Sequence, residues 1–361
     1  MRTIRVILII YIIMIDFLSG KDVHAQSIQL SHIEHIMGFP SAEAGIEKGV
    51  SACFAGTVDN TLLMAGGCNF PDKPAAEGGE KRFYQGIYAA QITDKNELHW
   101  QCVGRLPAPC AYGVSIPLEE GLLCIGGNNA TESFATVVEI TLNGGQAQLK
   151  SYPDLPAKMD NFTGARSGER VVVSNGAQVF ALDLAHLEAG WQVLPPLTTK
   201  KLGQPVSAFV EGMFCQWGGC TPKTDTELTA LNIAGQSLTH PLKELLPPKN
   251  DAGEEIYLGG AAAISLSDDA FVAIGGVNKD VFLEAVNHPQ PGYMKHPVAW
   301  YRFNPYICVY QKGKWQIAGK EQIAARAGAS LAKHGHDVYL IGGELKPGVR
   351  TPDIYRLTFS Y

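Results

Sequence analysis

The chain has 361 residues, enough for one large hydrophobic core or two ordinary ones. Its hydrophobic fraction of 46% and charged fraction of 18% are typical of a soluble folded protein, and its 39 glycines predict many tight turns between short strands. The formal net charge of -6, without any basic cluster, gives no electrostatic support for binding to nucleic acid or to an anionic membrane.

Residues 1–25 have the pattern of a secretory signal peptide. Arg2 and Arg5 precede an apolar stretch at residues 6–18, and small residues precede Gln26. A membrane anchor is the alternative, but the stretch contains Asp16 and is shorter than the ~20 residues that a bilayer span needs. We therefore expect cleavage after residue 25 and a mature chain that is periplasmic or secreted and not attached to a membrane.

Six segments of the mature chain share one shape, a short apolar run that ends at a glycine. Their final glycines are 60, 49, 43, 57 and 67 residues apart, and the residues outside them form a sixth interval if the chain is joined into a circle. The segments are TLLMAGG, GLLCIGG, RVVVSNG, GMFCQWGG, DAFVAIGG and DVYLIGG, ending at Gly67, Gly127, Gly176, Gly219, Gly276 and Gly343. Self-similarity at such a period is typical of repeat architectures.

Each unit predicts four strands. A small apolar segment and a short polar turn precede the glycine-ending strand, and a third strand and a fourth, which often begins with Trp, follow it. A repeat of this kind every 50 residues or so is the kelch signature of a β-propeller. An irregular all-β sandwich would not explain the period. We therefore predict an all-β fold, a six-bladed kelch-type β-propeller over residues 26–361.

The last of the six units is one strand short. After Gly343 the chain has room for only one strand, DIYRLTFS, whereas the N-terminal segment IQLSHIEHIMGF is similar to the fourth strands of other units. We predict that this N-terminal strand pairs within the C-terminal blade and closes the ring, which leaves no open sheet edge.

All eight cysteines lie in the mature chain. An even number in an exported protein permits disulfides. However, Cys124 and Cys215 lie within apolar strand-like runs, where cysteine packs as a small hydrophobe. No Cys-x-x-Cys or Cys/His ligand spacing appears. We expect buried thiols and no metal site, and we leave possible pairing open.

Functional loops of a propeller are expected on one face. The loops after the glycine pairs are long and varied, whereas the hairpins on the other face are short and polar. The first set comprises residues 68–84, 128–133, 277–298 and 344–352, and the loops entering the blades on that face add Asn161, Lys201, Gln204, Glu255 and Arg326. This polar, amide-rich mixture suits a hydroxylated anionic small molecule better than an apolar one.

The segment GGELKPGVR is the most specific local feature. Glu344 directly follows a glycine pair, so it is expected near the central funnel, where a carboxylate can act as general base. Arg350 lies across a Pro-Gly turn, and its guanidinium could hold a carboxylate by two parallel hydrogen bonds. A salt bridge between the two residues that closes a surface turn is the alternative, and the spacing does not decide between them.

Other candidate sites are weaker. His334 and His336 occupy a hairpin on the opposite face, where turn formation explains them better than metal binding. His288 and His296 could touch a ligand or pack beneath their own loop. Gly-x-Gly-x-x-Gly and Walker patterns are absent, so nucleotide binding has no support.

The chain resembles the kelch-type N-acetylneuraminate epimerase (sialic acid mutarotase) family, in a cyclically permuted order. GGELKPGVRTPDIYRLTF is similar to that family's Gly-Gly-Glu-x-Lys-Pro-Gly-x-Arg-Thr segment, AIGGVNKDVF to its Gly-Gly-Val-Asn segment, and AYGVSIP with LLCIGG to a further blade. The resemblance implies that Glu344 is the catalytic base and that Arg350 takes part in activity. Candidate substrate contacts are Arg82, Asn128, Asn278, Arg326 and Lys346.

The resemblance also implies the reaction, which is interconversion of the α and β anomers of N-acetylneuraminate by ring opening. General acid–base catalysis would suffice, without a metal or redox cofactor, and we expect a monomer that acts on this small sugar acid. The alternative is a non-catalytic kelch propeller that binds glycan or protein partners. A sialidase or a copper-radical oxidase is disfavoured, because the sequence motifs of neither are found.

Overall fold

The structure is a computed structural model that describes residues 27–221, 235–237 and 244–360. The expected signal peptide at residues 1–25 lies outside the described residues. Within the described ranges, no helix combines the length and the apolar character needed to cross a bilayer.

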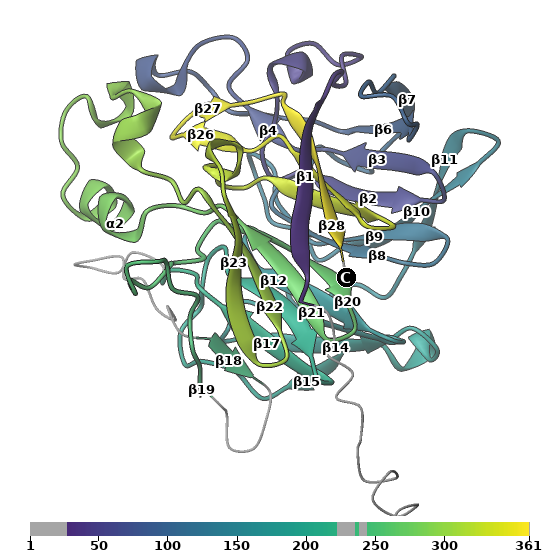
Figure 1. Ribbon diagram of the computed structural model, residues 1–361. Helices are drawn as coiled ribbons and strands as arrows, with labels where there is room; N and C mark the ends of the chain where they lie inside the picture. The colour runs from purple at the N-terminus through teal and green to yellow at the C-terminus, as the bar shows by residue number, and fades with distance from the viewer. Residues whose placement is uncertain (1–26, 222–234, 238–243, 361) are drawn as a thin grey trace, which may run out of the picture.

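The described part of the chain forms six four-stranded antiparallel sheets, in the all-β propeller arrangement that the repeat predicts (Figure 1). Three come from the first half: β2 (Phe54–Val58), β3 (Thr61–Ala65), β6 (Gly86–Gln91) and β7 (Gln101–Arg105); β8 (Val114–Pro117), β9 (Gly121–Ile125), β10 (Val137–Asn143) and β11 (Gln146–Ser151); and β12 (Thr163–Ser167), β13 (Arg170–Ser174), β14 (Val179–Asp183) and β15 (Gln192–Leu194).

The second half supplies the other three sheets. They are β16 (Val206–Val210), β17 (Met213–Trp217), β18 (Gly235–Ser237) and β19 (Glu244–Leu245); β20 (Ala262–Ser267), β21 (Ala270–Ile274), β22 (Tyr306–Gln311) and β23 (Lys314–Lys320); and β24 (Ser330–His334), β25 (Asp337–Ile341), β28 (Ile354–Ser360) and β1 (Gln29–Ile36). In this last sheet β1 pairs antiparallel with β28, from Gln29 opposite Ser360 to Ile36 opposite Ile354.

Smaller elements lie between the second and third strands of three sheets. Two short hairpins are formed by β4 (Cys68–Asn69) with β5 (Arg82–Phe83), and by β26 (Glu344–Lys346) with β27 (Val349–Arg350). The helix α2 (Lys279–Asn287) precedes two 3-10 turns, η4 (Tyr293–Lys295) and η5 (Val298–Tyr301). Further 3-10 turns are η1 (Ile46–Lys48), η2 (Ala75–Glu77), η3 (Leu187–Ala189) and η6 (Gln322–Ala324).

The glycine pairs end the buried second strands because no other residue fits there. Gly66 has φ +65°, and a Cβ atom on it would lie 2.2 Å from the carbonyl oxygen of Cys110 in the segment entering the next sheet. Gly342 has φ +57°, and its Cβ would lie 2.4 Å from the carbonyl oxygen of Val50. A left-handed backbone and close backbone packing therefore both require glycine at these repeat positions.

The innermost strands of the six sheets contact one another in a cyclic order: β2, β8, β12, β16, β20, β24 and again β2. Just before each of these strands stands one residue with positive φ, between +53° and +73°. Each of the six donates its backbone N–H to the carbonyl oxygen of the next, over 2.6–3.0 Å. In donor-to-acceptor order the residues are Ala52, Gly328, Gly260, Gln204, Asn161 and Tyr112. The N–H of Tyr112 donates to the carbonyl oxygen of Ala52, which closes the cycle. We call this set the mouth ring.

Hydrophobic clusters join neighbouring sheets. The fourth and fifth sheets share an aromatic group in which Trp217 lies 5.2 Å from both Phe271 and Tyr310 and 5.5 Å from Trp315, centroid to centroid. Such tilted and edge-on pairs stabilise beyond the area they bury. The core is thus distributed between the sheets, around the mouth ring.

The mouth ring predicts unequal effects on stability for two substitutions at equivalent positions. Gly328→Ala adds a Cβ at φ +59° and should lower the free energy of unfolding by about 1 kcal/mol. Ala52→Gly removes a Cβ from φ +56° and should be close to neutral, because relief of the left-handed strain offsets the greater freedom of glycine in the unfolded chain. Urea denaturation of both variants measures this, and equal destabilisation by the two would contradict it.

The eight cysteines form no disulfide within the described part of the chain. Burial raises the pKa of the Cys53 thiol to about 11 and the pKa values of Cys110 and Cys308 to about 12, whereas Cys102 is exposed. Because the thiolate is the reactive form, iodoacetamide at pH 8 should modify Cys102 in the native protein and leave the three buried thiols unmodified until urea is added. Peptide mass spectrometry reads out the sites, and rapid native labelling of Cys53 would refute the expected burial.

Candidate functional site

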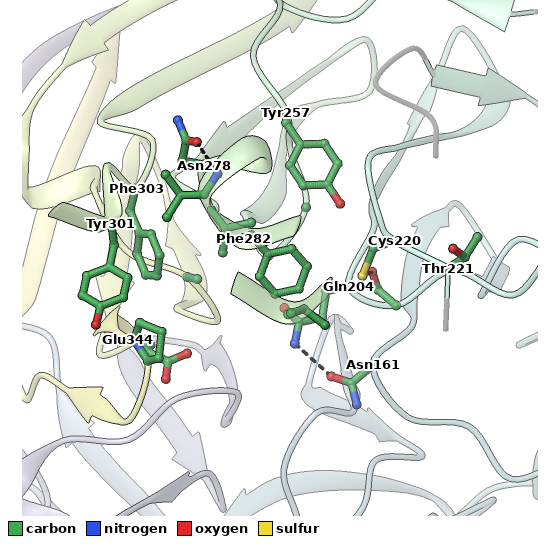
Figure 2. A pocket seen from close by; sticks show the side chains of 18 of the residues that line it. Asn161, Gln204, Cys220, Thr221, Tyr257, Asn278, Phe282, Tyr301, Phe303 and Glu344 are labelled. Atoms are coloured by element: carbon green, nitrogen blue, oxygen red, sulfur yellow. Dashed lines mark hydrogen bonds between the residues drawn. The ribbon is translucent and has the colours of Figure 1, made fainter. Parts of the chain in front are cut away.

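A cavity of about 520 Å³ opens beside the mouth ring (Figure 2). It lies on the face that carries α2 and the hairpin β26–β27, whose places in the fold are labelled in Figure 1. The mouth-ring residues Asn161, Gln204 and Gly260 line it, and so does Glu344. A volume of this size is usual for small-molecule sites. The predicted working face therefore carries a cavity, and the predicted entering-loop residues Asn161, Lys201 and Gln204 lie in its wall.

The cavity has a polar wall and an aromatic wall. Asn161 and Gln204 belong to the polar wall, where the Gln204 side-chain amide donates to Asn161 Oδ1 over 3.0 Å (Figure 2). The aromatic wall was not predicted, since the sequence indicated a polar surface. Its members are Tyr257, Phe282, Tyr293, Tyr301 and Phe303.

Most of the aromatic wall comes from residues 277–303, of which the sequence presented residues 277–298 as a long, varied loop. The structure contains helix α2 there. Asn278 is its N-cap and accepts a hydrogen bond from the N–H of Val281 over 3.0 Å, and Asp280 in the first turn interacts favourably with the helix dipole. The helix places Val281, Phe282 and Val286 in the cavity wall.

Glu344 is held at the cavity by backbone and side-chain hydrogen bonds. Its N–H and C=O both pair with Ala327, next to the mouth-ring residue Gly328. One carboxylate oxygen, Oε1, accepts from the N–H of Gly348 over 2.6 Å and from Nη1 of Arg350 over 2.7 Å. Within the described residues Oε2 has no such donor, and the side chain is 25% exposed. The carboxylate is therefore oriented through one oxygen, and the other is available to a ligand.

Arg350 lies behind Glu344. Its side chain is only 4% exposed, its Nε donates to Ser51 Oγ over 3.1 Å, and its guanidinium lies 5.0 Å from the ring centroid of Phe70. Burial acts to lower the pKa of Arg350, but the Glu344 carboxylate together with the neighbouring Tyr112 and Cys68 outweighs this and raises it. The salt bridge left open by the sequence is thus present, and it joins a buried arginine to a carboxylate in a cavity wall.

Of the predicted substrate contacts, Asn278 is in the cavity wall, and Lys346 lies outside that wall but holds a neighbouring segment in place. The side-chain oxygen of Asn278 caps α2. The ammonium of Lys346 donates to the carbonyl oxygens of His296 over 2.6 Å and Met294 over 3.2 Å, and thereby ties the segment after α2 to strand β26.

The structure does not bring the other three predicted contacts into the cavity wall. Arg326 is 2% exposed and donates to the backbone carbonyl oxygens of Ile323 and Gly342. Arg82 pairs with Asp72 over 2.5 Å at the surface. Asn128 pairs through its backbone with Ala111 in the second sheet.

The histidines of the long segment make local contacts. His288 lies 3.1 Å from Glu284 of the same helix, and the ring of His296 stacks on Trp300 with centroids 4.0 Å apart. His334, in the opposite-face hairpin, contacts Asn60 over 2.8 Å.

Comparison with known proteins gives a consistent family. The model of the N-acetylneuraminate epimerase family matches residues 18–149 and 152–361. A relative named N-acetylneuraminate epimerase from Haemophilus influenzae (strain PittEE) is 28% identical over 233 residues, 59% of this chain and 61% of that protein. One from Salmonella enteritidis PT4 (strain P125109) is 27% identical over 236 residues, 61% of this chain and 60% of that protein. The chain thus matches about 60% of the length of these relatives.

A solved structure titled "Structure of YjhT" is similar to this chain with a TM-score of 0.58 and 12% identity, over 87% of this chain and 98% of that one. At this identity the likeness concerns the fold, and it agrees with the all-β propeller. Because the family model covers nearly the whole sequence, the chain belongs to the N-acetylneuraminate epimerase family.

Proposed function

We propose that this protein is an isomerase that interconverts the α and β anomers of N-acetylneuraminate. Membership of the family supports this, as do the names of its relatives. The observation that carries the proposal is the Glu344 carboxylate, fixed through Oε1 and presented to a cavity by Oε2. A carboxylate held in this way can move a proton at a bound hydroxyl group.

The proposed reaction opens and recloses the sugar ring. Glu344 Oε2 accepts the proton of the anomeric hydroxyl, the carbonyl forms at C2, and the bond from C2 to the ring oxygen breaks. The ring oxygen then takes up a proton from the Glu344 carboxyl group. Rotation about the bond to C2 presents the other carbonyl face, and the same steps in reverse give the other anomer. The reaction is redox-neutral, and the carboxylate is regenerated.

Arg350 acts in this proposal by positioning Glu344. Its buried guanidinium fixes Oε1 by a charge-assisted hydrogen bond, while Glu344 remains in the cavity wall. Its side chain is only 4% exposed, and two of its N–H donors are engaged with Glu344 and Ser51, which argues against the carboxylate-binding role that the spacing had suggested.

We also infer that the six sheets are six blades of one closed ring, over residues 26–361. The cyclic hydrogen bonds of the mouth ring and the pairing of β1 with β28 support this. A cyclic permutation of blade order would explain why relatives align over only part of their length. We propose further that residues 1–25 direct export to the periplasm or the medium, and that the mature protein acts as a monomer.

Glu344→Gln should abolish the acceleration of mutarotation, because an amide cannot accept and return the proton. General acid–base catalysis contributes ~10²–10⁴-fold, so the loss should be of this order. Anomer exchange of N-acetylneuraminate, followed by proton NMR with and without the protein, measures the rate. The exposed Glu80 of the 68–84 loop provides a matched control, and Glu80→Gln should keep full activity. Full activity of Glu344→Gln would refute the assignment, and an inactive wild-type protein would favour the non-catalytic alternative.

Arg350→Met should lower kcat on the order of 10- to 100-fold and change KM little, because the residue orients the base and lies out of reach of substrate. Arg350→Lys should recover part of the rate, since it restores a charge without the planar fork. Anomer exchange at several substrate concentrations separates the two parameters, with thermal melting to correct for unfolded protein. A raised KM at unchanged kcat would instead show that Arg350 binds the substrate carboxylate.

A further inference from the structure

Lys81 is a cation held in a fixed position beside the mouth ring. It immediately precedes β5, and its ammonium donates to the phenol oxygen of Tyr112 over 3.2 Å. The ammonium also lies 5.1 Å from the ring centroid of Tyr112, 5.9 Å from that of Phe70 and 6.0 Å from that of Phe83. Cation–π attraction from three rings restrains it, although the residue is exposed. An ammonium has three N–H donors, so two remain after the bond to Tyr112.

Tyr112 lines the central channel, which the mouth ring and the innermost strands enclose, rather than the neighbouring cavity that Glu344 lines. It belongs to the mouth ring, with φ +60°, and its oxygen also accepts a weak hydrogen bond from the thiol of Cys68 over 3.5 Å. Burial, and then the neighbouring Cys68, raise the pKa of Tyr112, so the phenol stays protonated at neutral pH. Its O–H is therefore a donor at the channel entrance.

These two groups lie next to the Glu344–Arg350 pair. Phe70 contacts both cations, with the Arg350 guanidinium 5.0 Å and the Lys81 ammonium 5.9 Å from its centroid. Tyr112 is close enough to raise the pKa of Arg350, and the charge of Glu344 acts on Tyr112 in turn. Ala52 and Gly328 follow Tyr112 around the mouth ring toward Ala327, the backbone partner of Glu344, and they line the same channel as Tyr112.

The other nearby cations fit a substrate carboxylate less well. Arg350 is 4% exposed and engaged with Glu344 and Ser51. Lys201 lines the cavity beside Gly203, which pairs with Cys220, and Figure 2 shows Cys220 across the cavity from Glu344. In a 2-keto sugar acid the carboxylate is bonded to the anomeric carbon, so the group that binds it must lie beside the base.

We propose that Lys81 and Tyr112 bind the carboxylate of the sugar acid at the mouth ring, and thereby place the anomeric hydroxyl against Glu344. The inference rests on the proposed function and names the residues that select an anionic substrate. Lys81 supplies charge and N–H donors, and Tyr112 supplies its O–H. The two cations then have separate roles. The buried Arg350 orients the base, and the exposed Lys81 binds the substrate.

Equilibrium binding tests this separately from catalysis. Isothermal titration of N-acetylneuraminate and of its C1 methyl ester is carried out with wild type, Lys81→Met, Tyr112→Phe, Lys201→Met and Lys73→Met. Lys73 is an exposed lysine of the same loop and serves as the charge-matched control. Lys81→Met should weaken binding of the acid on the order of 10- to 100-fold and leave binding of the ester nearly unchanged. Tyr112→Phe should weaken binding of the acid about tenfold, and the control should have no effect.

Each outcome distinguishes the two proposals. Binding of the acid that depends on Lys81, without accelerated mutarotation, would support the carboxylate site and refute the enzymatic function. Accelerated mutarotation with Lys81→Met indistinguishable from Lys73→Met would overturn the carboxylate site alone. If only Lys201→Met weakened binding of the acid, the carboxylate site would lie on the opposite wall. If Lys81→Met weakened binding of the acid and the ester equally, Lys81 would not recognise the substrate charge. Absence of binding of the acid to wild type would refute both.

Discussion

Six backbone hydrogen bonds, passed from sheet to sheet around the mouth ring, hold the functional end of this molecule together. Each requires its residue to adopt a left-handed conformation, which costs roughly 1–2 kcal/mol wherever the residue has a Cβ atom. Ala52, Tyr112, Asn161 and Gln204 adopt it nevertheless, and the cooperative closure of the ring explains why the strain is tolerated. Tyr112, Asn161 and Gln204 line the central channel, and Asn161 and Gln204 also line the cavity that contains Glu344.

The repeat could be predicted from sequence because its physical requirement is local and is met by a glycine pair in five of the six units. Gly66 and Gly342 have positive φ, and a Cβ atom at either position would clash with a backbone carbonyl oxygen. Glycine is therefore required there, and the pattern recurs in the sequence. The mouth ring could not be predicted, because its requirement is met by five different residue types, and a single Ala or Gln carries no signal of a left-handed conformation. Glu344 was found because it stands directly after such a glycine pair. Within the aromatic wall, the place of Phe282 has a sequence signal, because Asn278 followed by Asp280 is a recognisable helix start. The other four aromatic residues lie outside α2 and have no such signal.

Burial separates candidate residues that the sequence presents as equals. Arg82, Arg326 and Arg350 all lie in loops of the working face, yet one pairs with a surface carboxylate, one braces backbone carbonyls in the interior, and one orients Glu344. No pattern in the neighbouring sequence distinguishes these roles, since each depends on contacts with segments far away in the chain. Lys81 illustrates the converse. It stands next to the predicted Arg82, and only the packing of Phe70, Phe83 and Tyr112 around its ammonium shows which of the two cations faces the channel entrance.

The division between a buried and an exposed cation has a physical reason. A guanidinium remains protonated when buried and offers a rigid set of donors, so Arg350 can fix one oxygen of Glu344 without competing for the substrate. An ammonium is strongly hydrated and is better kept near water, where binding a carboxylate costs little desolvation. If both cations contacted the substrate, the base would lose the partner that orients it whenever substrate arrived. The present arrangement lets the carboxylate of the substrate bind while the hydrogen bonds of Glu344 Oε1 remain intact, so the geometry of the base is the same in the empty and the occupied site.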